Sequence, residues 1–179
     1  MRVFDASFLL LAIRPHSPVA PDPATGKVID GVPQRIDYLI KTLSETGQPI
    51  LVPTPVLAEV FVVGGAAVAA DFSARIRRIP GVQVVDFDFR ASVECALLTS
   101  SALAVGRKRG AAIGEPWQKV KIDRQIVAIA KCHEAQTLYT TDGGLKALAE
   151  AEKIDVQHVA DLPLPPIDAQ VDAFPEDRQ

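Results

Sequence analysis

Short apolar runs rich in β-branched residues alternate along the chain with longer segments whose apolar residues recur every three or four positions. The first pattern is typical of buried strands, and the second of helices that pack one face against a core. Strands are predicted over residues 2–4, 49–52, 82–87, 137–140 and 154–159. Helices are predicted over residues 7–13, 66–79, 91–105 and 144–152, and in segments that start at Pro33, Thr54 and Asp123.

Strands that alternate with helices predict one parallel α/β sandwich, here spanning residues 1–162. Residues 15–32 hold four prolines and two glycines, which predicts a long loop between two helices. Prolines and acids dominate residues 163–179, so a poorly ordered C-terminal tail is expected there. The sequence shows no internal repeat and no second domain.

Residues 121–145 place two aspartates at one edge of the predicted sheet. Asp123 is expected at the start of a helix, and Asp142 follows the strand that comes after that helix. The helix is expected to start at the carboxyl edge of the sheet and run to the amino edge, and the strand after it returns to the carboxyl edge. Both aspartates are therefore expected near the carboxyl edge. Open α/β sheets bind their ligands at that edge. Asp5 ends the first strand, and Glu59 lies one turn inside the helix after the second strand, so four carboxylates are predicted to meet.

Four carboxylates in one place need compensation for their charge. Two like charges ~4 Å apart repel by about 4 kcal/mol at an effective dielectric constant near 20. A set of ligands made only of oxygen selects Mg²⁺ or Mn²⁺ rather than zinc, and such ions suit phosphoryl chemistry. The sequence therefore predicts a hard divalent cation at this edge.

Each acid also has an ordinary structural explanation when it is taken alone. Asp5 suits a turn at a strand end, and Asp123 suits a helix N-cap. Glu59 in a first helical turn is favoured by the helix dipole, and Asp142 followed by glycine is a common turn. The prediction of a site depends on all four reaching the same edge.

Four segments in order resemble the successive motifs of PIN-domain ribonucleases: residues 3–7 (VFDAS), 54–59 (TPVLAE), 123–130 (DRQIVAIA) and 138–142 (LYTTD). The resemblance implies a five-stranded parallel sheet with flanking helices and Mg²⁺- or Mn²⁺-dependent cleavage of RNA. It assigns the catalytic, metal-binding quartet to Asp5, Glu59, Asp123 and Asp142. Ser7 and Thr140 match the small polar residues that orient this quartet in the family.

Many stand-alone bacterial members of this family resemble VapC, the toxin of a type II toxin–antitoxin pair. The resemblance therefore implies an antitoxin partner that inserts a C-terminal segment into the active-site groove, and a homodimer. Two features depart from the family pattern. The loop over residues 15–32 is longer than in compact members, and Gly143 and Gly144 stand where some members carry a further acid.

The net charge of −3 excludes a strong global attraction to nucleic acid, but local basic groups remain candidates for binding RNA. Lys119 and Lys121 are the first of these because they are close in sequence to Asp123, and Trp117 could stack on a base. The weaker candidates are Arg107, Lys108, Arg109, Arg75, Arg77 and Arg78.

Cys95 and Cys132 fall in predicted helices without a CxxC pattern, which indicates reduced core residues of a cytoplasmic protein. No signal peptide and no membrane-spanning apolar run is recognisable in the sequence. The three histidines share no spacing typical of metal ligands.

The sequence lacks GxSxG, Walker-type and GxGxxG motifs. A haloacid-dehalogenase-like phosphatase would need an aspartate where Ser7 stands. The resulting hypothesis is a cytoplasmic endoribonuclease that hydrolyses RNA phosphodiester bonds. The alternative is a catalytically silent PIN-like scaffold that binds RNA or protein.

Overall fold

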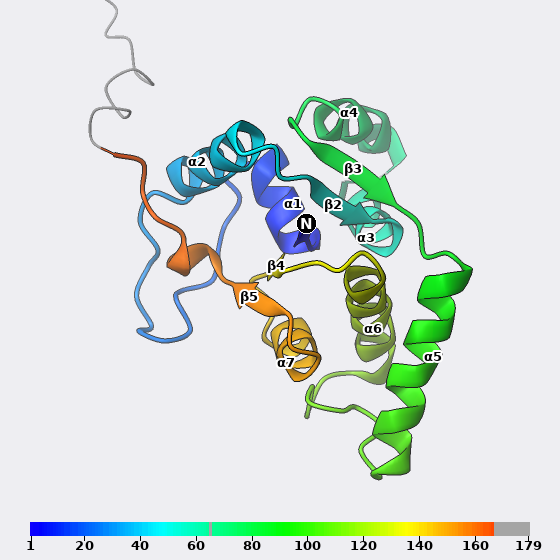
Figure 1. Cartoon of the computed structure of the whole chain (residues 1–179). Helices are drawn as coiled ribbons and strands as arrows, with labels where there is room; N and C mark the ends of the chain where they lie inside the picture. Colours follow the sequence, from blue (N-terminus) through cyan, green and yellow to red (C-terminus); the bar gives the residue numbers. More distant parts are fainter. Residues whose placement is uncertain (65, 167–179) are drawn as a thin grey trace, which may run out of the picture.

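The fold is built on a parallel five-stranded sheet in the order β3-β2-β1-β4-β5 (Figure 1). This computed structural model describes residues 1–64 and 66–166. The strands are β1 (Arg2–Phe4), β2 (Ile50–Pro53), β3 (Val82–Val85), β4 (Thr137–Tyr139) and β5 (Asp155–Gln157). The predicted α/β class and the parallel five-stranded sheet are therefore confirmed.

In the part of the chain that the structure describes, seven α-helices connect the strands and one short 3₁₀ helix follows the last strand (Figure 1). They are α1 (Ala6–Ile13), α2 (Val32–Glu45), α3 (Thr54–Gly64), α4 (Ala66–Ile76), α5 (Phe89–Ala104), α6 (Trp117–Cys132), α7 (Gly143–Ala151) and η1 (Val159–Asp161). Most predicted boundaries agree with these to within three residues. Apolar periodicity places elements well and their ends less well.

Helix α6 is the exception, because it begins at Trp117 and not at Asp123. Pro116 stands at its N-cap position, and Val120 extends the buried face formed further along by Ile126 and its neighbours. The prediction that Asp123 starts this helix is therefore wrong. Asp123 instead lies inside the helix on its buried face, with 5% of its surface exposed.

The two faces of the sheet are covered by different helices, which gives the three layers of the predicted sandwich. Because side chains alternate along a strand, neighbouring residues of one strand enter different cores. Phe4 of β1 packs with Phe8 of α1 and Ile36 of α2, whereas Val3 belongs to the core that contains α6 and α7. Both cores are almost fully apolar, so the sheet is held from both sides.

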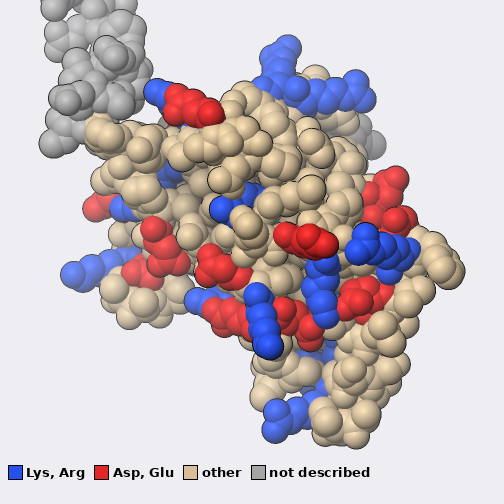
Figure 2. Space-filling view, in the orientation of Figure 1, with Lys and Arg blue, Asp and Glu red and all other residues tan. Residues whose placement is uncertain are grey.

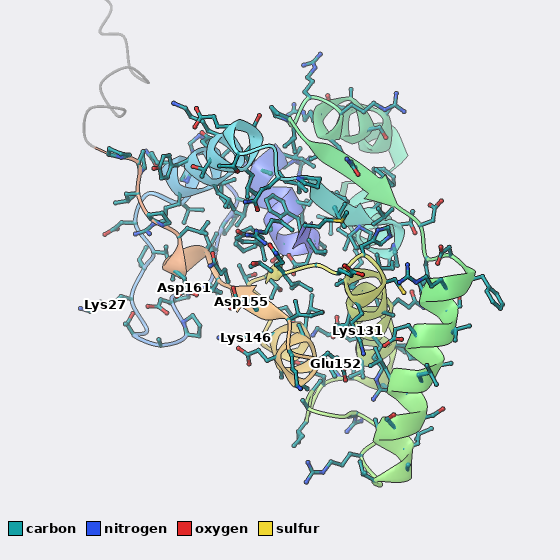
Figure 3. The ribbon with its side chains drawn as sticks, in the orientation of Figure 1. Lys27, Lys131, Lys146, Glu152, Asp155 and Asp161 are labelled. Carbon is teal, nitrogen blue, oxygen red and sulfur yellow. The ribbon has the colours of Figure 1, made fainter. Side chains whose placement is uncertain are left out.

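Three helices on one side of the sheet are tied together by Lys131 of α6. Its Nζ lies 2.6 Å from Glu94 Oε1 of α5 and 2.7 Å from Glu152 Oε2, just after α7. Figure 3 labels Lys131 and Glu152, which face each other across the α6–α7 contact. This links the elements that flank the acidic edge.

The structure also tests the predictions for the long loop, the two cysteines and membrane-spanning segments. The long loop predicted over residues 15–32 connects α1 to α2. Cys95 and Cys132 are free and lie in helices, but both are partly exposed and therefore are not core residues. Within the described residues, no helix is both long and apolar enough to cross a bilayer. Of the predicted tail, residues 167–179 lie outside the described residues.

Replacing Phe8 by alanine tests the packing of the sheet against α1. Phe8 is fully buried, with its ring centroid 5.7 Å from that of Phe4 and 5.4 Å from that of Tyr139. We expect Phe8→Ala to lower the free energy of unfolding in urea by about 3–5 kcal/mol. Phe89→Ala is the matched control, because Phe89 is 85% exposed, and should change it by less than about 0.5 kcal/mol. Equal losses for the two variants would contradict this packing.

Candidate active site

The topology brings acidic residues from four segments to the carboxyl edge of the sheet. Asp5 follows β1, Glu59 lies in α3 directly after β2, and Asp142 follows β4. Asp123 comes to the same place from α6. These are the four acids that the sequence predicted to meet, and their charges influence one another, as the pKa shifts described below show.

Asp5 is the most enclosed of the four carboxylates, with 4% of its surface exposed. Its Oδ1 accepts hydrogen bonds from Ser7 Oγ at 2.7 Å and from the backbone N–H of Phe8 at 2.9 Å. Its Oδ2 accepts one from Thr140 Oγ1. The N–H of Phe8 is one of the free donors at the start of α1, so Asp5 is the N-cap of that helix as well as a site residue.

Ser7 and Thr140 join the two strands that flank the site. Besides donating to Asp5, Ser7 Oγ accepts a hydrogen bond from the N–H of Thr141 at 3.0 Å. Thr140 Oγ1 likewise accepts one from the N–H of Asp142 at 2.9 Å. The two hydroxyls therefore fix Asp5 and the turn after β4 relative to each other.

Asp142 lies between β4 and α7. Its Oδ1 accepts a hydrogen bond from the N–H of Leu145 at 2.9 Å, which makes it the N-cap of α7. The same oxygen lies 2.7 Å from Nζ of Lys119. Asp142 thus has the turn and capping role expected of an aspartate before glycine, and it also belongs to the acidic group.

Lys119 places a positive charge among the acids. Its Nζ lies 2.7 Å from Asp142 Oδ1, 3.3 Å from Asp123 Oδ2 and 3.3 Å from Glu115 Oε2. Glu115 was missed by the sequence analysis. Glu115 lies before the N-cap residue Pro116 and therefore outside α6, so no helical spacing in the sequence indicates its contact with Lys119.

Burial and mutual repulsion raise the pKa values of three of the four acids. Burial raises the pKa of Asp5 to about 6. The hydrogen bonds from Thr140 and Ser7 oppose this rise, and repulsion from Asp142 adds to it. Burial likewise raises the pKa of Asp123 to about 6, although Lys119 opposes the shift.

Two further shifts show how closely these groups interact. Burial and then repulsion from Asp142 raise the pKa of Glu59. Burial would also raise the pKa of Asp142, but its contacts with Lys119 lower it below the ordinary value. Three acids with raised pKa values therefore accompany a fourth, Asp142, whose pKa is lowered.

The chemistry of this donor set fits a hard divalent cation, because it consists of carboxylate oxygens whose burial disfavours their negative charge. As the side chains stand, however, no three acidic, histidine or cysteine side chains among the described residues are grouped closely enough to hold a metal ion. The Lys119 ammonium contacts two of the four acids, Asp123 and Asp142, as well as Glu115, so it is the cation of the site in this structure.

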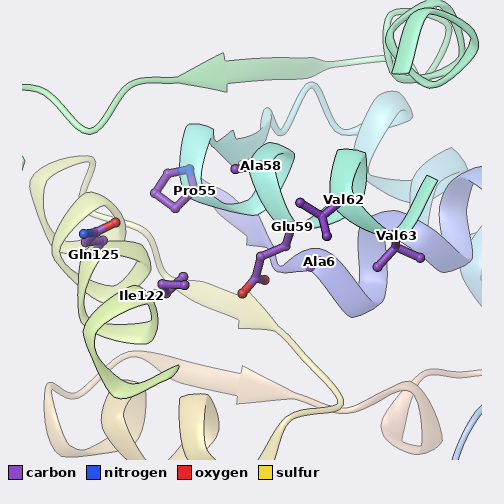
Figure 4. Close-up of a pocket in the computed structure, with 8 residues that line it drawn as sticks. All are labelled: Ala6, Pro55, Ala58, Glu59, Val62, Val63, Ile122 and Gln125. Atoms are coloured by element: carbon purple, nitrogen blue, oxygen red, sulfur yellow. The ribbon is translucent and has the colours of Figure 1, made fainter. Parts of the chain in front are cut away.

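A groove with a volume of about 610 Å³ lies beside Glu59, between α3, α6 and the start of α1 (Figure 4). Figure 4 shows Glu59 pointing from α3 towards Ile122 of α6 and Ala6 of α1. Most of the lining is apolar, and Val62 and Val63 at one end are 82% and 64% exposed. An exposed apolar groove next to a charged site is a candidate surface for a partner.

The basic candidates are placed unequally. Lys119 lies inside the acidic group, and Lys121 is exposed on the same helix. The loop residues Arg107, Lys108 and Arg109 are exposed before α6. Figure 2 shows Asp and Glu side chains interspersed with Lys and Arg on the face in view, so this face carries no continuous basic surface.

The Trp117 ring contacts cations of its own chain, and two of the arginine candidates lie away from the acids. Lys108 Nζ is 4.5 Å and Arg124 Cζ 5.5 Å from the centroid of the Trp117 ring, so this ring already contacts two cations of its own chain. Arg77 and Arg78 lie between α4 and the start of β3. That is the amino edge of the sheet, opposite the acids.

Comparison with known proteins agrees with this architecture. No protein-family model and no curated protein sequence matches the chain. Among solved structures, it is similar to a chain in the crystal structure of VapBC2 from Rickettsia felis bound to a DNA fragment from their promoter. The TM-score is 0.52 at 13% sequence identity, and the match covers 88% of this chain and 97% of that chain. At this identity the likeness shows the fold, which agrees with the PIN-like fold that the sequence motifs implied.

The raised pKa of Asp5 makes the stability of the metal-free protein depend on pH. Because its pKa is about 6 in the folded protein and 3.8 ordinarily, the folded state binds a proton more tightly than the unfolded state between these values. The free energy of unfolding should therefore fall as pH rises from 4 to 6.5, by about 2–3 kcal/mol from Asp5. Asp123 should add to this fall.

Urea unfolding of the wild type and Asp5→Asn in chelator, over this pH range, measures the effect. Asparagine can still cap α1 but does not titrate. The free energy of unfolding of Asp5→Asn should therefore fall with pH about half as steeply as that of the wild type. Identical slopes in the two proteins would show that Asp5 does not carry the raised pKa.

Gly143 and Gly144 provide a matched pair at the start of α7. A Cβ at Gly143 would meet nothing within 4 Å, whereas one at Gly144 would lie 2.8 Å from Glu115 Cγ and 2.9 Å from Lys119 Nζ. Gly143→Ala should raise the free energy of unfolding by about 0.5–1 kcal/mol by restricting the unfolded chain. Gly144→Ala should gain less or lose stability, since the Glu115 and Lys119 side chains must move. Equal gains in urea unfolding would contradict the close packing at Gly144.

Proposed function

We propose that this protein is a metal-dependent endoribonuclease that hydrolyses RNA phosphodiester bonds with Mg²⁺ or Mn²⁺. The observation that carries the proposal is the pair of buried carboxylates, Asp5 and Asp123, at the carboxyl edge of a PIN-like sheet. Two buried acids of raised pKa beside further carboxylates reduce stability above pH 6, and structural need alone does not account for that cost. A divalent cation offsets it and gives the acids a function.

The metal ligands in this proposal are Asp5, Glu59, Asp123 and Asp142. When bound, the ion would stabilise charge on a phosphate and lower the pKa of a water molecule. Ser7 and Thr140 hold the Asp5 carboxylate in one orientation through its two oxygens. The N–H of Asp142 donates a hydrogen bond to Thr140 Oγ1, which fixes the position of Asp142 relative to Asp5. Preorganisation of this kind limits the reorganisation needed during reaction.

RNA would reach these acids past Lys119, with Lys121 and the loop residues Arg107, Lys108 and Arg109 contacting its backbone. Such contacts depend on salt and are independent of sequence. Arg124 donates a hydrogen bond to the carbonyl of Lys108 at 2.8 Å, which anchors this basic loop to α6. The anchored loop is adjacent in sequence to Glu115, so it leads directly to the acidic group.

The biological role that we propose is that of a toxin in a type II toxin–antitoxin pair, acting in the cytoplasm. The groove beside Glu59 supports this role, because an extended or helical antitoxin segment could fill it and reach the acids. The fold likeness to a chain of the VapBC2 complex is in keeping with it. A homodimer forms part of the same proposal.

A non-catalytic scaffold is the second candidate, and one observation favours it. Among the described residues, the acids are not grouped to hold a metal ion, and Lys119 already lies between Asp123 and Asp142. A scaffold would use the same edge to bind RNA or protein without cutting it.

Cleavage assays distinguish the two candidates. The wild type should cut a labelled single-stranded RNA of mixed sequence with Mg²⁺ or Mn²⁺ and should stop when the metal is chelated. Asp5→Asn and Asp123→Asn should lower the rate by about a hundredfold or more, because each removes a charged oxygen from the reacting centre. Glu45→Gln, which removes an exposed carboxylate paired with Lys41, is the control and should keep the wild-type rate.

RNA binding measured by fluorescence anisotropy in the same buffers completes the design. Binding without cleavage by the wild type in either metal would favour the scaffold and contradict the nuclease. Cleavage by the wild type that the two aspartate variants retain would show that another site performs the reaction.

A further inference from the structure

We propose that Lys119 is a built-in cation that a divalent metal must displace, so that its ammonium group sets the affinity of the site for metal. The proposal rests on the proposed function, because it takes the same carboxylates to be metal ligands. It goes further by giving Lys119 a role in the metal-free protein. Lys119 then acts as a positioning residue and not only as a contact for RNA.

The position of the ammonium group carries the inference. Its Nζ lies within 3.3 Å of oxygens from three acids, Glu115, Asp123 and Asp142. The lysine side chain is 31% exposed, so most of it is enclosed by the protein. An ammonium group has three donors, and these three carboxylates are enough to occupy all of them.

The surroundings of Lys119 are shaped to hold it there. Lys119 and Asp123 are one turn apart on α6, and Glu115 lies four residues before Lys119. At Gly144, the space that a Cβ would fill is closed by Glu115 Cγ at 2.8 Å and Lys119 Nζ at 2.9 Å. Because Gly144 has no side chain, the ammonium group and Glu115 can occupy this space between α6 and the start of α7.

A metal and the ammonium group cannot both bind the oxygens that Lys119 contacts, Asp123 Oδ2 and Asp142 Oδ1. A lysine side chain is long and flexible, so it can leave the acids and remain tethered to α6. Metal binding then exchanges one compensating cation for another and does not fill an uncompensated acidic site. Among the described residues, no three acids are grouped closely enough to hold a metal. The exchange accounts for this, because the ammonium group holds the converging acids at its own distances.

Metal titration of Lys119→Met is the direct test. By calorimetry with Mn²⁺, this variant should bind at least about tenfold more tightly than the wild type, the ratio expected when one charge-assisted contact no longer competes. Lys121→Met removes an exposed positive charge two residues further along the same helix and should change the dissociation constant by less than about twofold. Lys119→Gln is a second variant in case the methionine variant fails to fold.

Thermal unfolding in chelator tests the role of Lys119 without metal. Lys119→Met should unfold about 2–4 °C below the wild type, because the acids lose their cation. Added Mn²⁺ should remove this difference in melting temperature. Lys121→Met should unfold with the wild type under both conditions. Unchanged melting of Lys119→Met in chelator would overturn the proposal.

The outcomes separate this inference from the proposed function. If the wild type and Lys119→Met bind Mn²⁺ equally, the displacement is wrong and the nuclease proposal stands. If neither binds Mn²⁺, both the metal-dependent function and the displacement are overturned. If only the lysine variants bind, Lys119 excludes metal from the free protein, which supports the inference in its strongest form.

Discussion

The buried carboxylate of Asp5 is the constraint on which the rest of the site depends. It lies between β1 and α1, caps the helix through Phe8, and accepts hydrogen bonds from Ser7 and Thr140. These bonds join the first and fourth strands at the edge where the other acids arrive. Because burial raises the pKa of Asp5 to about 6, the fold carries a destabilising charge near neutral pH. The neighbouring acids add to that charge, so the site needs a cation.

Lys119 and a divalent metal are two solutions to the same electrostatic problem. The lysine is always present and neutralises Asp142 and Asp123 only in part, since the pKa of Asp123 remains raised. A divalent ion carries twice the charge and accepts more oxygen ligands. In the proposed exchange, the weaker cation keeps the acids assembled before a metal binds, without fixing a rigid empty site.

Most of the fold and the four acids could be predicted from the sequence, because strand and helix periodicity and the ends of parallel strands place them. Asp5 and Asp142 followed directly from strand ends. The start of α6 could not be predicted, since residues 117–122 (WQKVKI) mix apolar and polar side chains and only Val120 among them is buried. The role of Lys119 depends on that turn, on Glu115 of the loop before it, and on the contact with Asp142 at the start of α7, which lies further along the chain. Such contacts appear only once the helices are packed.

The central claim is that these acids converge to hold a hard cation, and the most direct measurement is anomalous diffraction from crystals grown or soaked with Mn²⁺. We predict a manganese peak among the carboxylates of Asp5, Asp123 and Asp142, with the Lys119 ammonium moved away from Asp142. No peak at this edge, with Lys119 still bound to Asp123 and Asp142 at saturating Mn²⁺, would contradict the account.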